Sequence, residues 1–267
     1  MCELFAMASR LPASVNLSLE EFAKHGGQTG GHQDGWGIAY YDDGDALLIR
    51  EPRPASRSAH MNFVRGQFGS TLVISHIRKA TMGSLSLKNT QPFARELAGR
   101  VHVFAHNGML PGIFETLGLS TRHYQPMGET DSEYAFCVLL ERLAAIWIDN
   151  RSSPPLDERL AVVAEFASQI RELGPANFIY CDSEVIIAHG HKRKHSEGTR
   201  PPGLHFLCRS CEDEPTPVDV AGLNISTRYD SQDLVLLASV PLSDESWTPL
   251  KEGELLLLQG GYVVERV

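Results

Sequence analysis

Cys2 is the residue whose position first suggests chemistry in this 267-residue chain. Removal of Met1 would leave a thiol and a free α-amino group on one residue. Because a backbone α-amine has a reference pKa of about 7.7 to 8.0, it can take a proton from the thiol or from water near neutral pH. Cys2 would then supply both a nucleophile and its base, without a separate histidine. Taken alone the cysteine means little, since any residue can follow an initiator methionine.

Two glycine-containing segments lie next to predicted strands. GHQDGWG, residues 31–37, lies just before a predicted strand and surrounds Asp34 with glycines, which permit a close backbone approach or a strained turn. SHIRKATMG, residues 75–83, ends a strand and carries Arg78 and Thr81 into the next loop. A guanidinium in that loop could bind a carboxylate through two parallel hydrogen bonds, and a plain surface arginine is the alternative.

Two more segments hold polar groups at the ends of predicted elements. HNG, residues 106–108, follows a strand, so the side-chain amide of Asn107 and the backbone N–H of Gly108 could point together at an oxyanion. A simple Asn-Gly turn would also explain it. GETDSE, residues 128–133, places Asp131 at a helix start, where the helix dipole keeps the carboxylate ionised and ready for a ligand ammonium. Helix capping is the alternative here.

The order of these pieces resembles one family. An N-terminal Cys, a Gly-rich HxDGxG segment, an HxRxAT segment, HNG and ETDSE are similar to the class II glutamine amidotransferases, the group that contains glucosamine phosphate synthase and the phosphoribosylpyrophosphate amidotransferase. The motifs lie in roughly the first half of the chain. The closing stretch, LVLLASVPLSDESWTPLKEGELLLLQG, resembles the end of the stand-alone glutaminase-domain subfamily, so we expect residues 1–267 to form a single domain.

The resemblance implies an α+β fold, a four-layer αββα sandwich of the N-terminal nucleophile hydrolase type. It also implies that glutamine is the substrate, that its γ-amide is cleaved through a cysteine thioester to glutamate and ammonia, and that no cofactor is needed. The implied roles are Cys2 as nucleophile with its own amine as base, Arg78 and Thr81 on the substrate α-carboxylate, Asn107 and Gly108 as oxyanion hole, and Asp131 on the substrate α-amine.

Three residues depart from the family pattern. Lys79 and Met82 stand where synthase-linked members usually have Trp and His in the loop that closes over glutamine, and Glu3 replaces a glycine that often follows the nucleophile. Too few residues remain for a second catalytic domain, so any ammonia acceptor would be a separate protein. Two alternatives stay open: hydrolysis of another γ-glutamyl amide or peptide, and a non-catalytic glutamine-sensing subunit.

The elements that must position these residues follow from apolar patterning. Helices are predicted from Ser18, with Glu21 as capping partner and Gly26-Gly27 as stop, from Thr130 with Glu133 through Ile146, and from Leu156 to Leu173. Asp42-Asp43-Gly44 predicts a hairpin turn. Short apolar runs predict strands at Leu4–Ala8, Trp36–Tyr41, Ala46–Arg50, Leu72–His76, Val101–Ala105, Asn177–Tyr180, Val185–His189, Leu204–Leu207, Leu234–Ala238, Leu255–Leu258 and Tyr262–Val264.

Composition narrows the class of protein. Hydrophobic residues at 42% and charged residues at 21% are ordinary for a globular domain with a sizeable core. The net charge of −9 disfavours nucleic acid and anionic membrane as partners and favours a small-molecule substrate. The start lacks the pattern of a signal peptide and no apolar run would cross a bilayer, so we expect a cytoplasmic location.

No metal site is predicted. Five scattered cysteines do not form a disulfide pattern. Cys208 and Cys211 have zinc-like spacing but no second pair completes the site. His189, His191 and His195 lie in a basic segment that we interpret as a solvated turn.

Overall fold

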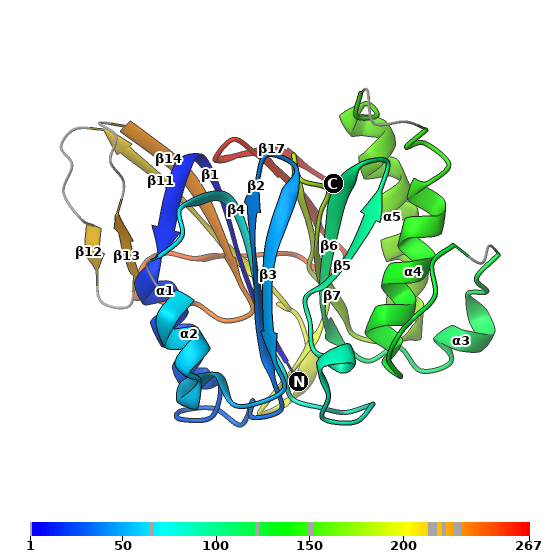
Figure 1. Cartoon of the computed structure of the whole chain (residues 1–267), viewed down its shortest axis with the longest axis horizontal. Coiled ribbons are helices and arrows are strands. Elements are labelled where there is room, and N and C mark those ends of the chain that lie inside the picture. The colour runs from blue at the N-terminus through cyan, green and yellow to red at the C-terminus, as the bar shows by residue number, and fades with distance from the viewer. Residues whose placement is uncertain are drawn as a thin grey trace.

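The structure, a computed structural model, has four layers. It describes residues 2–64, 67–120, 123–148, 152–212, 218–220, 223–226 and 231–267, with only the backbone described for Leu17 and for residues 211, 212, 218–220, 223–226 and 231. Two antiparallel sheets lie face to face in the middle, and helices cover the outer face of each sheet (Figure 1). The predicted αββα sandwich is therefore confirmed.

The first sheet contains nine described strands around a long N-terminal strand, β1, which covers Glu3–Val15. Its main order is β15-β11-β14-β1-β4-β2-β3, and β13 pairs with both β12 and the far end of β1. The other strands are β2 Trp36–Asp42, β3 Asp45–Glu51, β4 Ser70–Ile77, β11 His205–Glu212, β12 Val218–Val220, β13 Leu223–Ser226, β14 Ser231–Ala238 and β15 Thr248–Pro249.

The second sheet has the order β17-β16-β8-β7-β6-β5, again with every pairing antiparallel. A separate short hairpin joins β9 and β10. The bounds are β5 Phe93–Leu97, β6 Arg100–Gly108, β7 Ala176–Cys181, β8 Ile186–His189, β9 Arg193–His195, β10 Gly198–Arg200, β16 Leu255–Gln259 and β17 Tyr262–Arg266.

Helices form the two outer layers. Those on the first sheet are α1 Asn16–His25 and α2 Ala59–Val64, and those on the second are α4 Asp131–Leu143 and α5 Leu156–Leu173, as Figure 1 shows. A short helix, α3 Ile113–Thr116, packs against α4, and single 3-10 turns lie at Ala55–Arg57 and Leu87–Asn89.

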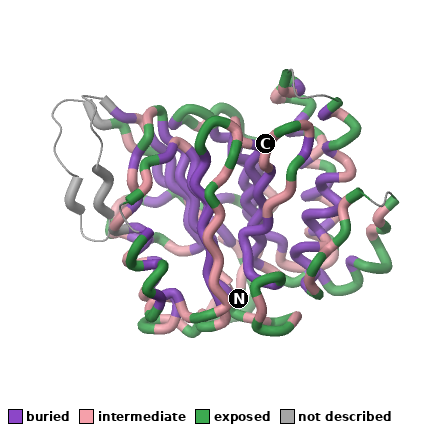
Figure 2. Tube along the Cα trace, viewed as in Figure 1, coloured by how far each residue is buried: buried purple, intermediate pink, exposed green. Residues whose placement is uncertain are grey.

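Three hydrophobic cores hold these layers together, because the central strands are buried on both faces (Figure 2). Successive side chains of a strand point to opposite faces. In β1, Phe5 and Met7 pack in the core beneath the helices, whereas Leu4 and Ala6 pack in the core between the sheets. Because this alternation extends to the start of the strand, the Cys2 side chain belongs to the inter-sheet face and the Glu3 side chain to the helix face.

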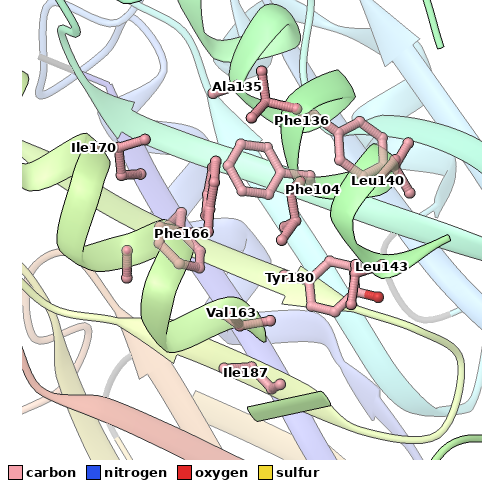
Figure 3. Close-up of a cluster of buried hydrophobic side chains, with 14 of the residues drawn as sticks. Phe104, Ala135, Phe136, Leu140, Leu143, Val163, Phe166, Ile170, Tyr180 and Ile187 are labelled. Atoms are coloured by element: carbon pink, nitrogen blue, oxygen red, sulfur yellow. The ribbon is translucent and has the colours of Figure 1, made fainter. Parts of the chain in front are cut away.

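The core between the second sheet and its helices is rich in aromatic rings (Figure 3). The rings of Phe104 and Phe136 stack with their centroids 5.4 Å apart, and Phe166 and Phe178 close the cluster at 5.7 Å from one another. The inter-sheet core instead contains several alanines, among them Ala6, Ala8, Ala39, Ala105 and Ala188. Large rings therefore separate helix from sheet, and small side chains let the two sheets approach.

Most predicted elements are present, and two helix boundaries differ. The α5 bounds and the strand positions are confirmed, and the hairpin between β2 and β3 turns through Asp43 and Gly44, both at positive φ. The first helix begins at Asn16, not at Ser18, which is fully buried inside it. No side chain caps its start; burial of Leu19 and Phe22 against the sheet anchors it instead.

The second difference concerns the helix that starts after Thr130. Thr130 caps α4 as expected, by accepting a hydrogen bond from the backbone N–H of Glu133. The helix ends at Leu143, however, and Ile146 lies in the turns that follow. Strand β5 was not among the predicted elements, since its sequence FAREL alternates too little to stand out.

The interpretation of the histidine-rich segment as a solvated turn is wrong for His189 and His191, which are buried. His189 lies on β8, its Nδ1 is 2.7 Å from the carbonyl oxygen of Ala176, and its ring stacks on Phe178. Burial lowers the pKa of His189 to about 4, so the ring is neutral at neutral pH. The basic residues that suggest a solvated turn follow Gly190, where the chain has left the sheet, whereas His189 is still part of β8.

Candidate active site

Cys2 lies just before β1, at the end of the two-sheet interior. Its Sγ is 3.3 Å from the backbone nitrogen of Lys79, which donates a hydrogen bond to it, and 3.4 Å from the Lys79 carbonyl oxygen. The thiol opens into a small pocket shared with four other residues that the sequence singles out: Arg78, Thr81, Gly108 and Asp131. The fold thus brings residues from four separate segments to one place.

The surroundings of Cys2 determine the state of its thiol. Burial raises the pKa of Cys2, and the Lys79 N–H and the Arg78 cation oppose this shift only in part. The thiol is therefore protonated at neutral pH, and nucleophilic attack requires a base that accepts its proton. Within Cys2 itself, a free α-amine would be such a base.

Arg78 follows β4 and is almost completely buried. Its Nη2 donates to the carbonyl oxygens of Met82 and Gly83, and its Nη1 donates to that of Ser84. Three of its five N–H donors hold the loop in this way. The guanidinium borders the pocket, so it combines a structural role in the loop with a fixed positive charge beside Cys2.

The glycine-rich segment supports this loop from beneath. The Asp34 carboxylate accepts a hydrogen bond of 2.8 Å from the backbone nitrogen of Ala80, and its own backbone N–H donates to the Arg78 carbonyl. The Gly35 carbonyl accepts from the Arg78 backbone N–H, with Gly35 at a φ of 142° that favours glycine. The segment therefore fixes the position of Arg78 and does not itself border the pocket.

Asn107 and Gly108 form the end of β6, and the structure places them differently. Gly108 borders the pocket, and a Cβ on this residue would lie 1.7 Å from the Pro175 carbonyl oxygen, so no side chain fits. Asn107 is fully buried in the inter-sheet layer, and its Nδ2 is 3.4 Å from Ser239 Oγ. Its Oδ1 has no hydrogen-bond partner among the described residues.

Asp131 is the first residue of α4, as predicted. Its Oδ2 accepts a hydrogen bond of 2.8 Å from the backbone nitrogen of Leu110, and its Oδ1 accepts one of 2.8 Å from that of Ser132. These two hydrogen bonds fix the position of the carboxylate at the N-terminus of α4. A negative charge thus faces the same pocket as the positive charge of Arg78.

Three polar pocket residues had no role from sequence: Gln91, His106 and Ser132. The Gln91 side-chain amide pairs with the backbone of His106, accepting from its N–H at 2.6 Å and donating to its carbonyl at 3.1 Å. The Nδ1 of His106 is 2.9 Å from Ser132 Oγ. His106 and Ser132 lie inside the HNG and TDSE motifs, which was the available signal, whereas nothing in the local sequence marks Gln91.

A tether links the loop after Arg78 to the segment before α4. Asn89 Nδ2 donates to the Glu129 carboxylate at 2.6 Å, and Asn89 Oδ1 accepts from the Glu129 backbone N–H at 2.9 Å. Lys88 forms an ion pair with the same carboxylate. Hydrogen bonds from Lys88 and Asn89 lower the pKa of Glu129 to about 2, so the tether stays charged at neutral pH.

Glu3 occupies the position where the family often has glycine. It directly follows Cys2 and lies in a cluster of charged side chains. Its carboxylate is buried and its Oε2 is 2.7 Å from His25 Nδ1. His32 Nε2 and Arg193 Nη2 each lie 3.9 Å from its Oε1. Although burial opposes it, these partners lower the pKa of Glu3, while the hydrogen bond to Glu3 raises the pKa of His25.

Two classes of site are not found in the described part of the chain. No group of three or more His, Cys, Asp or Glu side chains there could hold a metal ion. Cys208 is exposed on β11, and the side chain of Cys211 lies outside the described residues. None of the helices described is long and apolar enough to cross a membrane.

The αββα sandwich, with Cys2 at the head of its central strand, is the fold of the N-terminal nucleophile class. The model of the class II glutamine amidotransferases matches residues 1–267, and the chain belongs to that family. YafJ of Escherichia coli (strain K12) is 33% identical over 257 residues, which cover 95% of this chain and 96% of YafJ.

Solved structures agree with this assignment. A Pseudomonas aeruginosa PA01 protein described as a predicted glutamine amidotransferase has a TM-score of 0.70 and 30% identity, covering 99% of this chain and 100% of its own. The glutamine phosphoribosylpyrophosphate amidotransferase of B. subtilis has a TM-score of 0.60 and 16% identity, covering 97% of this chain and 47% of its own. At that identity the second likeness shows the fold alone.

The Glu3 cluster generates a pH-dependent prediction. The Glu3→Gln substitution is expected to lower the free energy of unfolding by about 2 kcal/mol at pH 5.5, because it removes a buried charge-assisted hydrogen bond. The lowered pKa of Glu3 means that its contribution is present above its ordinary value of 4.5 and is lost on acidification. The raised pKa of His25 means that its contribution is present below 6.5 and is lost as the pH rises.

Urea unfolding of both proteins at pH 5.5 and pH 9 measures this effect, and the difference should be smaller at pH 9. Glu20→Gln is the matched control, since Glu20 lies on α1 as an exposed partner of Lys24 and its loss should cost under about 0.5 kcal/mol. An equal difference for Glu3→Gln at the two pH values would contradict the assigned His25 pairing.

Proposed function

We propose that this protein hydrolyses the γ-amide of glutamine to glutamate and ammonia through a thioester on Cys2, once Met1 has been removed. The observation that carries the proposal is the shared pocket of Cys2, Arg78 and Asp131. The pocket offers a thiol beside one fixed cation and one fixed anion. A free amino acid with a reactive side-chain carbonyl has the complementary groups, namely an α-carboxylate, an α-ammonium and an electrophilic carbon. We also propose that residues 1–267 act as one domain.

The first step is addition of the Cys2 sulfur to the γ-carbonyl carbon. The α-amine of Cys2 takes the thiol proton, and the carbonyl oxygen becomes an oxyanion that accepts hydrogen bonds from the Gly108 N–H and the Asn107 amide. The amine then returns the proton to the departing nitrogen, and ammonia leaves as the tetrahedral intermediate collapses to a thioester.

The second step consumes water. The same amine takes a proton from a water molecule, which adds to the thioester carbonyl and forms a second oxyanion in the same position. Its collapse breaks the carbon–sulfur bond, the sulfur regains the proton and glutamate is released.

The decisive test uses chain confirmed by intact mass to begin at Cys2. It should release equal amounts of glutamate and ammonia from glutamine. Inserting one alanine between Met1 and Cys2 should abolish turnover, because after Met1 removal the Cys2 nitrogen remains in a peptide bond and cannot act as a base.

Cys2→Ala, which retains a terminal amine and loses the thiol, is the matched control and should also be inactive. Turnover by the alanine-extended chain at the normal rate would overturn the mechanism. Glutamine binding by calorimetry together with no turnover in the authentic chain would support the glutamine-sensing alternative.

Arg78 generates a separate prediction about substrate binding. Arg78→Lys keeps the charge but loses the planar fork, so the KM for glutamine should rise about tenfold or more while kcat changes less. Arg100→Lys, a half-buried arginine at the start of β6 that pairs with Glu184, should leave both constants near normal. An unchanged KM for Arg78→Lys would argue against the carboxylate role, and circular dichroism would establish that the loop change does not unfold the chain.

A second candidate function, hydrolysis of a γ-glutamyl compound with a larger leaving group, is favoured by Lys79. This residue borders the pocket and its backbone contacts the Cys2 sulfur. Its ammonium lies above Gly31, where a Cβ would be 3.5 Å away, and no described carboxylate pairs with it. A carboxylate on the leaving amine could therefore pair with the Lys79 ammonium.

Matched substrates separate the two functions. γ-Glutamylglycine and γ-glutamylethylamide are similar in size, but only the first carries a carboxylate on its leaving group. If the second function holds, Lys79→Gln should lower kcat/KM for γ-glutamylglycine about threefold, the scale of an exposed ion pair, and leave γ-glutamylethylamide and glutamine unaffected. Equal effects on all three substrates would exclude recognition of the leaving group by Lys79.

A further inference from the structure

Ser239 connects β1, the strand that directly follows Cys2, with Asn107. It follows β14 and is buried. Its backbone N–H donates to the Leu4 carbonyl at 3.0 Å, and its hydroxyl oxygen accepts from the Leu4 backbone nitrogen at 3.0 Å. The same hydroxyl lies 3.4 Å from Asn107 Nδ2 across the inter-sheet layer. Ser239 thus contacts both sheets, and its contact on β1, Leu4, is two residues from Cys2 in the chain.

The hydrogen-bonding groups at this contact do not balance in the orientation observed. The Ser239 hydroxyl accepts from Leu4 and from Asn107. In the part of the chain that the structure describes, its own proton then has no acceptor and the buried Asn107 Oδ1 has no donor. A half-turn of the amide exchanges its nitrogen and oxygen. The Ser239 hydroxyl then donates to Asn107 Oδ1, and the NH2 group takes the buried position that has no partner among the described residues.

The half-turn also frees the Asn107 amide nitrogen. Asn107 lies beside Gly108, which borders the pocket of Cys2. Its side chain is on the inter-sheet face of β6, as is the side chain of Cys2 on the opposing sheet. With its oxygen held by Ser239, the amide directs its NH2 group away from Ser239.

We propose that Ser239 is a positioning residue, whose hydroxyl holds the Asn107 amide with its oxygen toward β14 and its NH2 group toward the oxyanion formed at Cys2. This inference rests on the proposed hydrolysis and adds to it a residue that does not touch the substrate. The backbone of Ser239 is itself held, because Arg193 Nη1 donates to its carbonyl oxygen at 2.5 Å. Arg193 also faces Glu3, so the anchor is continuous with the charged cluster behind the nucleophile.

Substitution of Ser239 should affect the chemical step and spare substrate binding. Ser239→Ala is expected to lower kcat for glutamine at least about tenfold, toward the loss typical of one oxyanion donor, while KM changes less than about twofold. Ser239→Cys, which keeps the size and a weak S–H donor, should give an intermediate kcat.

Ser70→Ala is the matched control. Ser70 is equally buried in the same sheet, and its hydroxyl also accepts from a backbone N–H, that of Leu72, and donates to backbone carbonyls. It pairs with Ala13, at the far end of β4 from Cys2. A normal kcat in this variant shows that loss of a buried hydroxyl alone does not slow the reaction.

A double-mutant cycle separates positioning from a general structural effect. In an Asn107→Ala background, itself expected to be slower by about a hundredfold or more, Ser239→Ala should cause no further loss of kcat, because the amide that it positions is gone. Equal fold-losses in the two backgrounds, or a kcat for Ser239→Ala within twofold of normal, would overturn the inference while leaving the proposed hydrolysis intact.

Failure of the underlying proposal gives a different pattern. If Asn107→Ala turns over glutamine at the normal rate, the oxyanion role is wrong and the Ser239 role is overturned with it, whereas Cys2→Ala still reports on the nucleophile. If Ser239→Ala does not fold, as judged by circular dichroism, the same cycle is run with Ser239→Cys, and the same two outcomes decide.

Discussion

The position of Cys2 depends on the register of β1 in a sheet that is covered on both faces. Glu3 pairs with Ile77 and Leu4 with His76, so the side chains of β1 are assigned alternately to the helix core and to the inter-sheet core. A slip of one residue would exchange the two sets and move every apolar side chain to the wrong layer. The same register places Cys2 beside Lys79, and it turns Glu3 toward His25, where its buried charge has partners.

Much of this arrangement could be predicted from the sequence, for two physical reasons. Strands buried on both faces give continuous apolar runs, such as LFAMA in β1 and VHVFA in β6, and these are hard to mistake. The chemical groups of the pocket come from short segments at strand or helix ends, where Arg78, Gly108 and Asp131 already stood out. The capping of α4 by Thr130 is likewise a local interaction that adjacent residues encode.

What the sequence could not provide are contacts between residues far apart in the chain. Ser239 meets Asn107 across 132 positions, and Gln91 is placed by the backbone of His106, so neither partner is marked by its neighbours. Glu3 looked like an unexplained substitution until its partners on α1 and β9 were placed. His189 shows the same limit. The basic residues near it in the sequence predict a solvated turn, but pairing of β8 with β7 buries its side chain.

The alanines between the sheets have a consequence for how such a site is built. Cys2 precedes the central strand of one sheet, whereas Asn107 and Gly108 belong to the other, so the Cys2 sulfur and the proposed donors are held relative to one another by packing across the interior and by the Ser239 contact. Ala6, Ala8 and Ala105 act as thin spacers in that interior. The distance between the Cys2 sulfur and the groups on the opposite sheet is therefore set by small methyl groups that lie in the core between the sheets.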